Sequence, residues 1–577
     1  MSTAKTVESP STYRSWLARL GSAVVVVHVA AVAWSGYVHT PVLDEIAHLP
    51  AGLAVLKLGR TDVYSVNPPA VKFVAALPLL LIDHQEDWST LDVSQRKRQE
   101  WLLGHQFIRL NGRRTWWLMT LARWSCLPFT VMGALVCWKW ANEVLGPEGG
   151  FVSLLLWCCS PNVIGYASLI TPDIPSSSCF LLASYLFHKW LQSGTWPRVF
   201  LCGGAFGLLL LVKTQWIILL AIWPILLGCS LWKHDQLRRQ NLAQFAVILL
   251  LAWNILCAGY GFRGVGTRLG TIPFYSAMLT GETRHPTSAG PDRIQWKFLH
   301  DVPSPLPVDF IQGIDRQKID FEMGRQCYLL GKWYERGHWS FYIVALAVKL
   351  PSGLILLLFC GAILVMVHWS RSIGELREFS ALFLPAMVLF AIASMQTGLH
   401  TYFRYMTPVL PVAYLFAAWT WHSLRQTRLH WYATVCCVLC VVESLAVYPH
   451  GMSFFNMLSG GSAHGHKILT DANIDWGQDL KFVERWIEDH PDARPITLTT
   501  WELFDPNEFG LPPALKDPTK PGPGWHIVSL NKLNWPNDQF NKLAAMTPVD
   551  RIGYSHVVIY IPERPDNSEP VAADKSL

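Results

Sequence analysis

Long apolar runs alternate with short polar connections along most of this chain. Hydrophobic stretches of about 20 residues are long enough to cross the hydrocarbon core of a bilayer as a helix. The runs lie at about 18–37, 115–140, 150–168, 174–191, 199–212, 215–232, 242–260, 341–368, 379–397, 403–421 and 431–448. We therefore predict an α-helical polytopic membrane protein with about eleven transmembrane helices, some of them short enough to be tilted.

Three segments lack long apolar runs: 38–113, 261–340 and everything after 448. In the last segment, β-branched residues form short strand-like runs at 495–501, 526–530 and 556–561. Residues 479–490 have the pattern of an amphipathic helix, and Pro491 would end it. We predict a membrane domain at 1–448, which includes the loops 38–113 and 261–340, and a small soluble α/β domain at 449–577.

The composition supports a membrane protein. Hydrophobic residues make up 51% of the chain and charged residues 15%, whereas about 25% of a soluble protein is charged. All of the 13 cysteines except Cys327 lie in apolar runs, so they form neither a disulfide framework nor a zinc-binding spacing. We expect lipid around this protein and no nucleic acid as its partner.

Basic residues indicate the orientation of the predicted spans. They gather at alternate short connections: Lys139, Lys189, Arg198, Lys233, Arg238, Arg239, Arg371, Arg377, Arg425 and Arg428. Short loops rich in Lys and Arg face the cytoplasm. The N-terminus is therefore predicted to be cytoplasmic, with the two long loops and the C-terminal domain on the outer side of the cell (inner) membrane.

The first outer loop begins with an acidic helix pattern at 42–58. One face of this helix would be apolar: Ile46, Leu49, Leu53 and Leu56. Asp44 and His48 would share the opposite face, with Glu45 at its edge. This pattern is typical of a helix lying on a membrane surface with its polar face toward an aqueous cleft. Alternatively, Asp44 and Glu45 only complement the dipole at the helix N-terminus.

Three more charged residues lie at predicted outer ends of spans. They are Lys213, Arg404 and Asp173, and Asp173 lies in a tight turn directly after Thr171-Pro172. Each alone could be an interfacial anchor that extends its charge to the headgroups. Because charge at membrane depth is costly and concentrates at functional sites, these residues and Asp44 together predict an outward-facing site with acids and cations.

A second helix start follows at Asn67-Pro68-Pro69. Asn67 is expected to be the N-cap and a proline to occupy the first turn. Such a start directs free backbone N–H groups toward the cleft, which suits an anion. Lys72 would lie about one turn further along.

These motifs resemble those of a known family. Asp44-Glu45-x-x-His48 followed by Asn67-Pro68-Pro69-x-x-Lys72 resembles the first outer loop of membrane glycosyltransferases of the GT-C fold, in particular protein O-mannosyltransferases and lipid A aminoarabinose transferases. Thr171-Pro172-Asp173 is similar to their second acidic motif, and Arg404-Tyr405-x-x-Pro408 to their arginine-tyrosine-proline motif. Residues 471–480 resemble a stretch after the last span of bacterial, phospholipid carrier-dependent members.

Two features depart from the family pattern. Position 67 is Asn, where the resembling families mostly have His or Lys, so the resemblance does not by itself imply a phosphate contact there. No β-trefoil module interrupts the 261–340 loop, which weakens the case for a protein acceptor.

The resemblance implies transfer of a sugar from a polyprenyl-phosphate carrier to an acceptor hydroxyl on the outer face, with inversion. A phosphate leaves readily, so one base and several cations suffice. Asp44 would be the general base, and Glu45 and Asp173 would position sugar or acceptor. The remaining candidates bind substrate: His48, Asn67, Lys72, Lys213, Arg404 and Tyr405. A divalent metal held by Glu45 and Asp173 is left open, as are the sugar, the carrier and the acceptor, which could be lipid, glycan or protein.

Two other classes of protein would also need buried charge among membrane helices. One is a transporter or flippase of a lipid-linked anionic glycan, and the other a non-catalytic glycan-binding membrane protein. The charges gather at one face rather than at the midplane, and no internal repeat is detectable, which argues against a transporter.

Overall fold

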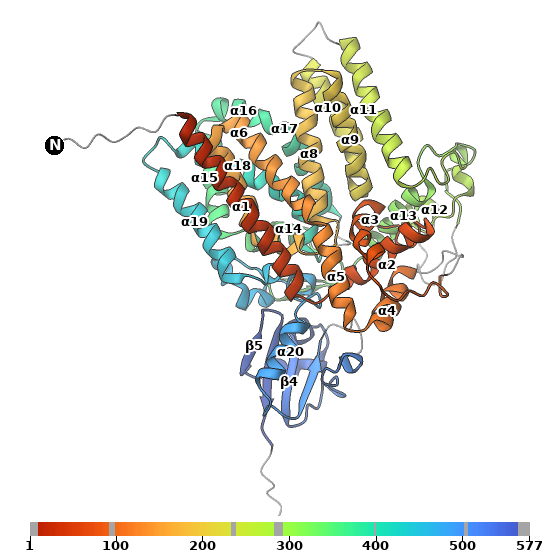
Figure 1. The fold of residues 1–577 in the computed structure, drawn as a ribbon, viewed down its shortest axis with the longest axis vertical. Coiled ribbons are helices and arrows are strands. Elements are labelled where there is room, and N and C mark those ends of the chain that lie inside the picture. The colour runs from red at the N-terminus through yellow and green to blue at the C-terminus, as the bar shows by residue number, and fades with distance from the viewer. Residues whose placement is uncertain are drawn as a thin grey trace, which may run out of the picture.

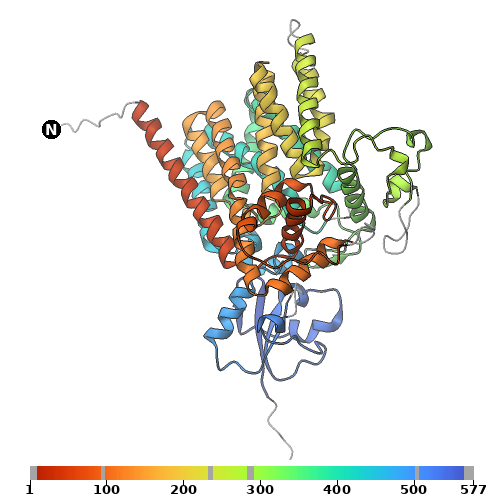
Figure 2. The ribbon, with the colours of Figure 1, turned by 45° about the vertical axis from the view of Figure 1, so that its right-hand side comes forward.

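A computed structural model describes residues 10–91, 98–231, 238–281, 292–396, 398, 400–500 and 506–563. It is a helical bundle with a small sheet module at one end (Figure 1). In Figure 2 the sheet module again lies at the same end of the bundle, next to the short helices that follow the first long helix.

Eight helices make up most of the bundle. They are α1 (Pro10–Val38), α6 (Leu127–Cys158), α8 (Asp173–Gln192), α9 (Trp196–Val212), α11 (Arg238–Gly259), α15 (Ser352–Val367), α18 (Leu410–Leu424) and α19 (His430–Val447). Helix α8 packs between α6 and α9, and α18 packs against α6 and α15. Large aromatic side chains fill the space between them, including Trp140, Trp157 and Trp223, which are fully buried.

Among the described residues, five helical segments are long and apolar enough to cross a membrane, as in a multi-pass protein. They are Tyr13–Val38, Arg114–Cys158, Gln240–Gly259, Trp369–Met395 and His430–Val447. The pair α14 (Phe341–Lys349) and α15, bent by 116°, could form a sixth. Other predicted spans, such as α9 and α10 (Leu219–Leu231), are shorter helices, so the number of about eleven spans stays a prediction.

Several predicted spans are broken in the structure at Pro or Gly. The run at 115–140 is divided into α5 (Arg114–Ser125) and the start of α6, near Pro128. Between this run and the next predicted span, α6 bends at Gly146, whose φ is 81° and which precedes Pro147. The predicted span 150–168 is divided into the end of α6 and a short α7 (Pro161–Ala167). Proline lacks the N–H that continues a helix, which explains these divisions.

The loop at 38–113 folds into a layer of short helices at the end of the bundle (Figure 1). It contains α2 (Leu43–Leu58), α3 (Pro69–Ala76), η1 (Leu77–Leu81) and α4 (Gln99–Asn111). Helix α2 lies close to both α3 and α4: a Cβ on Gly52 would come within 2.2 Å of the Lys72 carbonyl oxygen, and one on Gly104 within 2.5 Å of the Ile46 carbonyl oxygen.

This packing corrects one expectation about α2. His48 was predicted to face an aqueous cleft, but it is only 1% exposed. The predicted apolar stripe is not the only buried face, because residues from Glu45 through Ala54 are all buried. Residues 45–54 are therefore covered by neighbouring elements, whereas Asp44 at the N-terminus is half-buried and Lys57 and Leu58 at the C-terminus are exposed.

The loop at 261–340 and the late helices complete the helical part of the chain. The loop contains α12 (Ala277–Thr280), α13 (Val308–Met323) and the hairpin of β1 (Cys327–Leu329) and β2 (Lys332–Tyr334). Helix α16 (Trp369–Leu376) precedes α17 (Ser380–Met395). The short 3-10 helices that matter below are η2 (Thr214–Ile218), before α10, and η7 (Phe403–Val409), before α18.

The segment after α19 forms a four-stranded sheet with short helices. Its strands are β3 (Ile496–Thr499), β4 (Gly524–Ser529), β5 (Asp550–Ile552) and β6 (His556–Ile561), in the order β3-β4-β6-β5. The pair β3–β4 is parallel and the other two pairs are antiparallel. Helix α20 (Leu480–Asp489) buries Leu480, Val483 and Trp486, and α21 (Leu530–Leu533) and α22 (Asn541–Ala544) follow β4. Strands therefore form at all three β-branched runs, although Trp501 lies outside the described residues.

Backbone hydrogen bonds join this module to the entrance of α2. The Thr40 N–H donates to the Gln478 carbonyl at 2.9 Å, and the Leu43 N–H donates to the Trp476 carbonyl at 3.2 Å. The residues before α2 and those at 476–480 thus form one short paired unit, which fixes the position of Asp44 relative to Trp476.

Candidate active site

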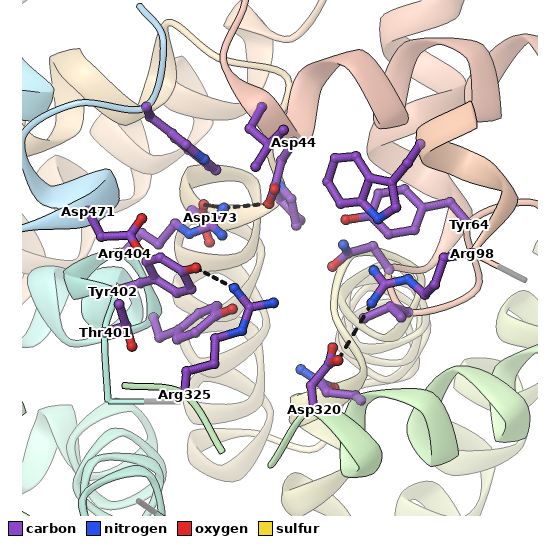
Figure 3. Close-up of a pocket in the computed structure, with 18 of the residues that line it drawn as sticks. Asp44, Tyr64, Arg98, Asp173, Asp320, Arg325, Thr401, Tyr402, Arg404 and Asp471 are labelled. Atoms are coloured by element: carbon purple, nitrogen blue, oxygen red, sulfur yellow. Dashed lines mark hydrogen bonds and ion pairs between the residues drawn. The ribbon is translucent and has the colours of Figure 1, made fainter. Parts of the chain in front are cut away.

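A cavity of about 520 Å³ lies where the loops 38–113 and 261–340, η7 and the segment after α19 meet. Its wall carries four cations and four acids: Arg98, Lys213, Arg325, Arg404, Asp44, Asp173, Asp320 and Asp471. Figure 3 labels these residues, except Lys213, around the open space, with the Asp44–Arg404 pair and the Arg98–Asp320 pair on opposite sides. The predicted gathering of charges at one end of the bundle is therefore present.

Arg404 lies at the centre of one wall. Its Nη1 is 2.7 Å from Asp44 Oδ2 and 3.9 Å from Asp173 Oδ2. Lys213 approaches the other oxygen of Asp173, with Nζ 3.0 Å from Oδ1. The four side chains thus form a row of alternating charge, drawn from α2, η7, α8 and the turn before η2.

Aromatic rings hold the guanidinium of Arg404 in place. Its central carbon lies 4.0 Å from the ring centroid of Trp476, 4.8 Å from that of Tyr402 and 5.4 Å from that of Tyr405. Arg404 Nε and Asp173 Oδ2 are buried and have no hydrogen-bond partner in the described structure. The wall therefore has a donor and an acceptor whose hydrogen-bonding capacity is unused.

The opposite wall contains charged residues that the sequence analysis did not single out. Arg98 forms an ion pair with Glu100, and its Nη1 lies 3.5 Å from Asp320 Oδ1. Arg325 donates to the Tyr402 hydroxyl at 2.6 Å, and among the described residues no carboxylate lies within 4.0 Å of it. Arg98 directly precedes α4 and Arg325 follows α13, and no sequence signal distinguished either arginine from surface charge.

Six of the nine predicted site residues line the cavity: Asp44, Asn67, Asp173, Lys213, Arg404 and Tyr405. Asn67 does so without being an N-cap, because the N-cap of α3 is Pro68, so that prediction is wrong. Glu45, His48 and Lys72 do not line the cavity.

Glu45 is buried and fully engaged. It accepts hydrogen bonds from Arg123 Nε at 2.9 Å and Nη2 at 2.5 Å, and from the backbone N–H groups of Val42 at 2.9 Å and Ile170 at 3.0 Å. A carboxylate offers about four acceptor positions, and here four donors use them. Glu45 therefore has little capacity left for a metal ion, and it joins α2, α5 and the turn before α8.

Lys72 and His48 are also internal. Lys72 Nζ donates to the carbonyl oxygens of Tyr64 at 2.5 Å and Asn67 at 2.7 Å. The His48 ring packs against Tyr64, with centroids 4.8 Å apart. Both side chains therefore support the loop 64–67, which forms part of the cavity wall, and neither reaches the space itself.

Asp471 adds an acid from the motif at 471–480. Its backbone has φ 61°, a left-handed conformation that Asp tolerates better than most residues. Its Oδ1 accepts the Ala472 N–H at 2.7 Å. Burial raises the pKa of Asp471 to about 6, although Arg325 and Arg404 act in the opposite direction.

The structure defines a class before any comparison: a multi-pass helical membrane protein with a charged cavity at one end of its bundle. Over residues 107–257, from the end of α4 to α11, the chain matches the model of the family described as dolichyl-phosphate-mannose-protein mannosyltransferase. The resemblance to protein mannosyltransferases seen in the motifs is thereby confirmed for that stretch. No curated protein matches the chain significantly.

Two solved structures resemble the fold distantly. Both are crystal structures of ArnT from Cupriavidus metallidurans, one in the apo state and one bound to undecaprenyl phosphate. The sequence identities are 13% and 11%, with TM-scores of 0.42 and 0.41. The alignments cover 95% and 93% of this chain and 98% and 97% of theirs. Likenesses this distant carry no information about individual residues.

Proposed function

We propose that this protein is a glycosyltransferase that moves a sugar from a polyprenyl-phosphate carrier to an acceptor hydroxyl. The observation that carries this proposal is an apolar groove of about 300 Å³ that shares Gln317 and Tyr405 with the charged cavity. Its wall is formed by η2, α13, α14 and α17 and contains Ile217, Ile218, Ile314, Phe321, Leu389 and Ile392. A substrate with an anionic head and a long hydrocarbon tail fits two such adjoining spaces.

The cations suit the phosphate of such a donor. Arg325 lies in the cavity wall without a carboxylate partner among the described residues, so binding an anion there breaks no existing ion pair. Arg404 can grip two phosphate oxygens at once, whereas Lys213 acts as a point charge. Fixed donors aimed at the departing phosphate stabilise the negative charge that develops on it during transfer.

Asp44 is the proposed general base. The acceptor oxygen attacks the anomeric carbon while the bond from that carbon to the phosphate oxygen breaks, and the electron pair remains on the phosphate. The hydroxyl proton passes to Asp44. Arg404 holds Asp44 at 2.7 Å in the described structure, and a phosphate that attracts this guanidinium leaves the carboxylate free to accept the proton. Direct displacement of this kind inverts the anomeric carbon.

Asp173 and the remaining cavity residues would position the reactants. Asp173 is tied to Lys213 on one oxygen and has no hydrogen bond on the other, which suits a sugar or acceptor hydroxyl. The proposal keeps the outward orientation, the roughly eleven spans and the boundary at 448 predicted from the basic loops and composition. Whether the sugar is a hexose or a pentose is left to experiment.

The test is transfer by the purified protein. We expect Asp44→Asn to bind undecaprenyl phosphate normally but to transfer radiolabelled sugar from a panel of polyprenyl-phosphate-linked hexoses and pentoses about a hundred- to ten-thousand-fold more slowly, since one base contributes about that much. Asp62→Asn is the control, because Asp62 pairs with Arg60 in the same loop and does not line the cavity. Near-normal transfer by Asp44→Asn would remove Asp44 as the base.

The alternatives make different predictions. A flippase would move the polyprenyl-phosphate-linked sugar across vesicle membranes without cleaving it, and Asp44→Asn would then abolish movement rather than transfer. A glycan-binding protein would retain the sugar without product. Either result, with no transfer from any donor of the panel, would overturn the proposed function.

A further inference from the structure

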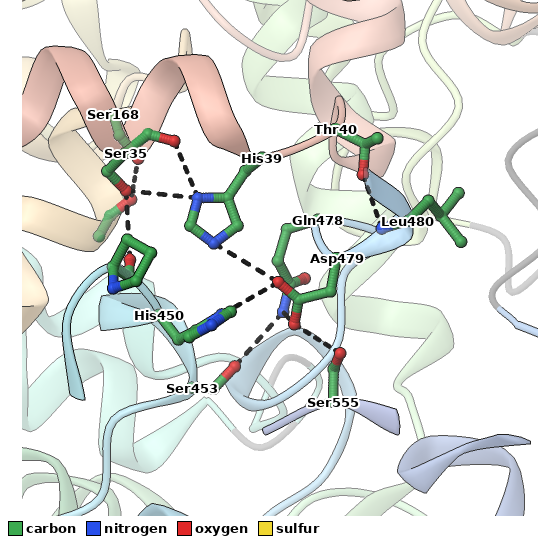
Figure 4. A network of polar contacts seen from close by, with 12 residues as sticks. Ser35, His39, Thr40, Ser168, His450, Ser453, Gln478, Asp479, Leu480 and Ser555 are labelled. Carbon is green, nitrogen blue, oxygen red and sulfur yellow. Dashed lines mark hydrogen bonds and ion pairs between the residues drawn. The ribbon is translucent and has the colours of Figure 1, made fainter. Parts of the chain in front are cut away.

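A second cluster of chemically capable side chains lies outside the cavity. It consists of His39, His450 and Asp479 (the His39–His450–Asp479 cluster), and none of the three lines the cavity. His39 directly follows α1, His450 lies just after α19, and Asp479 is the N-cap residue of α20. Figure 4 shows the two imidazoles directed at one carboxylate.

The distances within this cluster match those of a metal site. His39 Nε2 lies 3.4 Å from Asp479 Oδ1, and His450 Nδ1 lies 3.2 Å from the same oxygen. All candidate ligand atoms lie within 4.8 Å of one another. Zinc bonds to nitrogen and oxygen are about 2.0 Å long in a tetrahedral site, which puts neighbouring ligand atoms roughly 3.3 Å apart.

The tautomer of His39 presents a lone pair to this space. Its Nδ1 lies 2.8 Å from the Ser35 carbonyl oxygen, and a carbonyl can only accept, so Nδ1 carries the hydrogen. In the neutral ring Nε2 then has no proton, and it has no hydrogen-bond partner although His39 is 4% exposed. A buried lone pair facing a carboxylate oxygen at 3.4 Å is unfavourable unless a cation lies between them.

Neighbouring groups orient the carboxylate and leave room around it. The Ser555 hydroxyl donates to Asp479 Oδ2 at 2.5 Å, which turns Oδ1 toward the two histidines. A Cβ on Gly553 would lie 2.9 Å from both Asp479 Oδ2 and His450 Cε1. Outer hydrogen bonds of this kind, from ligand histidine to carbonyl and from hydroxyl to ligand carboxylate, are typical of metal sites.

We propose that the His39–His450–Asp479 cluster binds a zinc ion through His39 Nε2, His450 Nδ1 and Asp479 Oδ1, with water in the fourth position. Two imidazoles and one carboxylate suit zinc, whereas magnesium and calcium prefer oxygen ligands alone. The ion joins the end of the first span, the end of the last span and the sheet module.

A short stretch of chain connects the proposed zinc site to the cavity wall. His39 precedes Thr40, whose hydroxyl accepts the Leu480 N–H at 3.2 Å and donates to the Gly477 carbonyl at 2.7 Å. Zinc at this place therefore reinforces the pairing that holds Trp476 beside Arg404, independently of what reaction the cavity performs.

The test uses the full-length protein in detergent. After incubation with zinc chloride and removal of excess ion, elemental analysis is expected to find about one zinc per wild-type chain, and chelation should lower the melting temperature. His39→Gln and Asp479→Asn should lose the ion, whereas His464→Gln should keep it, because His464 is an exposed histidine outside the cluster.

Two further measurements test the site with all three ligands intact, in case the ligand variants fail to fold. Ser555→Ala should keep the ligands and weaken zinc binding about 10- to 100-fold, as loss of an outer hydrogen bond typically does. Cobalt titrated into chelator-treated wild type should show visible absorption typical of tetrahedral coordination. Zinc well below one equivalent in wild type, or one equivalent that persists in the folded His39→Gln variant, would overturn the site.

Discussion

The guanidinium of Arg404 stacks on the indole of Trp476, 4.0 Å from its ring centroid, although the helices α18 and α19 lie between them in the sequence. Asn473 reinforces this contact from the same segment, because its side chain accepts the Phe403 N–H at 2.9 Å and donates to the Thr401 carbonyl at 2.7 Å. The segment after the last span is therefore part of the cavity wall, and the predicted domain boundary at 448 does not separate it from the site.

Replacing Arg404 by lysine tests geometry at constant charge. We expect Arg404→Lys to weaken binding of undecaprenyl phosphate by about 10- to 100-fold, because charge-assisted hydrogen bonds contribute about 1.5–3 kcal/mol and lysine cannot form two parallel ones. Binding to the purified variant, followed by equilibrium dialysis, provides the measurement. An arginine that only anchors to headgroups would be replaced by lysine without loss, and unchanged binding in Arg404→Lys and Arg404→Ala would establish that role.

Arg325 provides a second test of the phosphate site. Arg325→Gln should weaken binding of the same lipid phosphate and reduce its salt dependence, because the variant loses a cation that has no carboxylate partner among the described residues. Arg336→Gln is the matched control: Arg336 lies on the same loop, is exposed and does not line the cavity. Equal losses in both variants would indicate a general electrostatic attraction instead of a defined contact.

Much of this architecture could be predicted because it depends on local pattern. Apolar runs of span length, β-branched runs and Pro or Gly breaks act within a few residues, and helices and strands formed at those places. The convergence of Asp44, Asp173, Lys213 and Arg404 followed from topology, since residues at the same ends of neighbouring helices must meet.

What could not be predicted depends on contacts between distant segments. The burial of His48 results from α3 and α4 covering α2, and no local pattern specifies that cover. Arg98 and Arg325 reach the cavity wall from positions next to α4 and α13, where no local pattern distinguishes them from surface charge. The burial of Glu45 could have been inferred from Arg123, which lies within an apolar run. A charge in such a run requires a partner of opposite charge, and here Glu45 is that partner.

Glu45 is expected to stabilise the folded protein rather than take part in the reaction. Glu45→Gln leaves the buried Arg123 without a counter-charge, and removing one partner of a buried ion pair costs about 3–5 kcal/mol. Thermal or denaturant unfolding in detergent measures the change. Asp489→Asn is the control, because Asp489 pairs with Arg485 on the exposed side of α20 and such pairs contribute about 0–1 kcal/mol. A variant that unfolds like wild type but no longer transfers sugar would instead assign Glu45 a role in the reaction.

Asp471 should make stability depend on pH in a defined direction. Burial raises the pKa of this carboxyl from 3.8 to about 6, so between these values the folded state binds more protons than the unfolded state. The free energy of unfolding therefore falls as the pH rises through this window, and the cost of the ionised group is fully present above pH 6 and absent below 3.8.

Asp471→Asn removes that cost and retains an oxygen that can accept the Ala472 N–H. The variant should therefore melt at a higher temperature than wild type at pH 7.5, and the difference should shrink as the pH falls toward 4. Asp517→Asn is the control, because that exposed carboxyl has a lowered pKa, owing first to its hydrogen bond with Thr519. Melting curves of both variants and wild type over this pH range measure the effect. An advantage of Asp471→Asn that is constant with pH would show that the carboxyl does not titrate near 6.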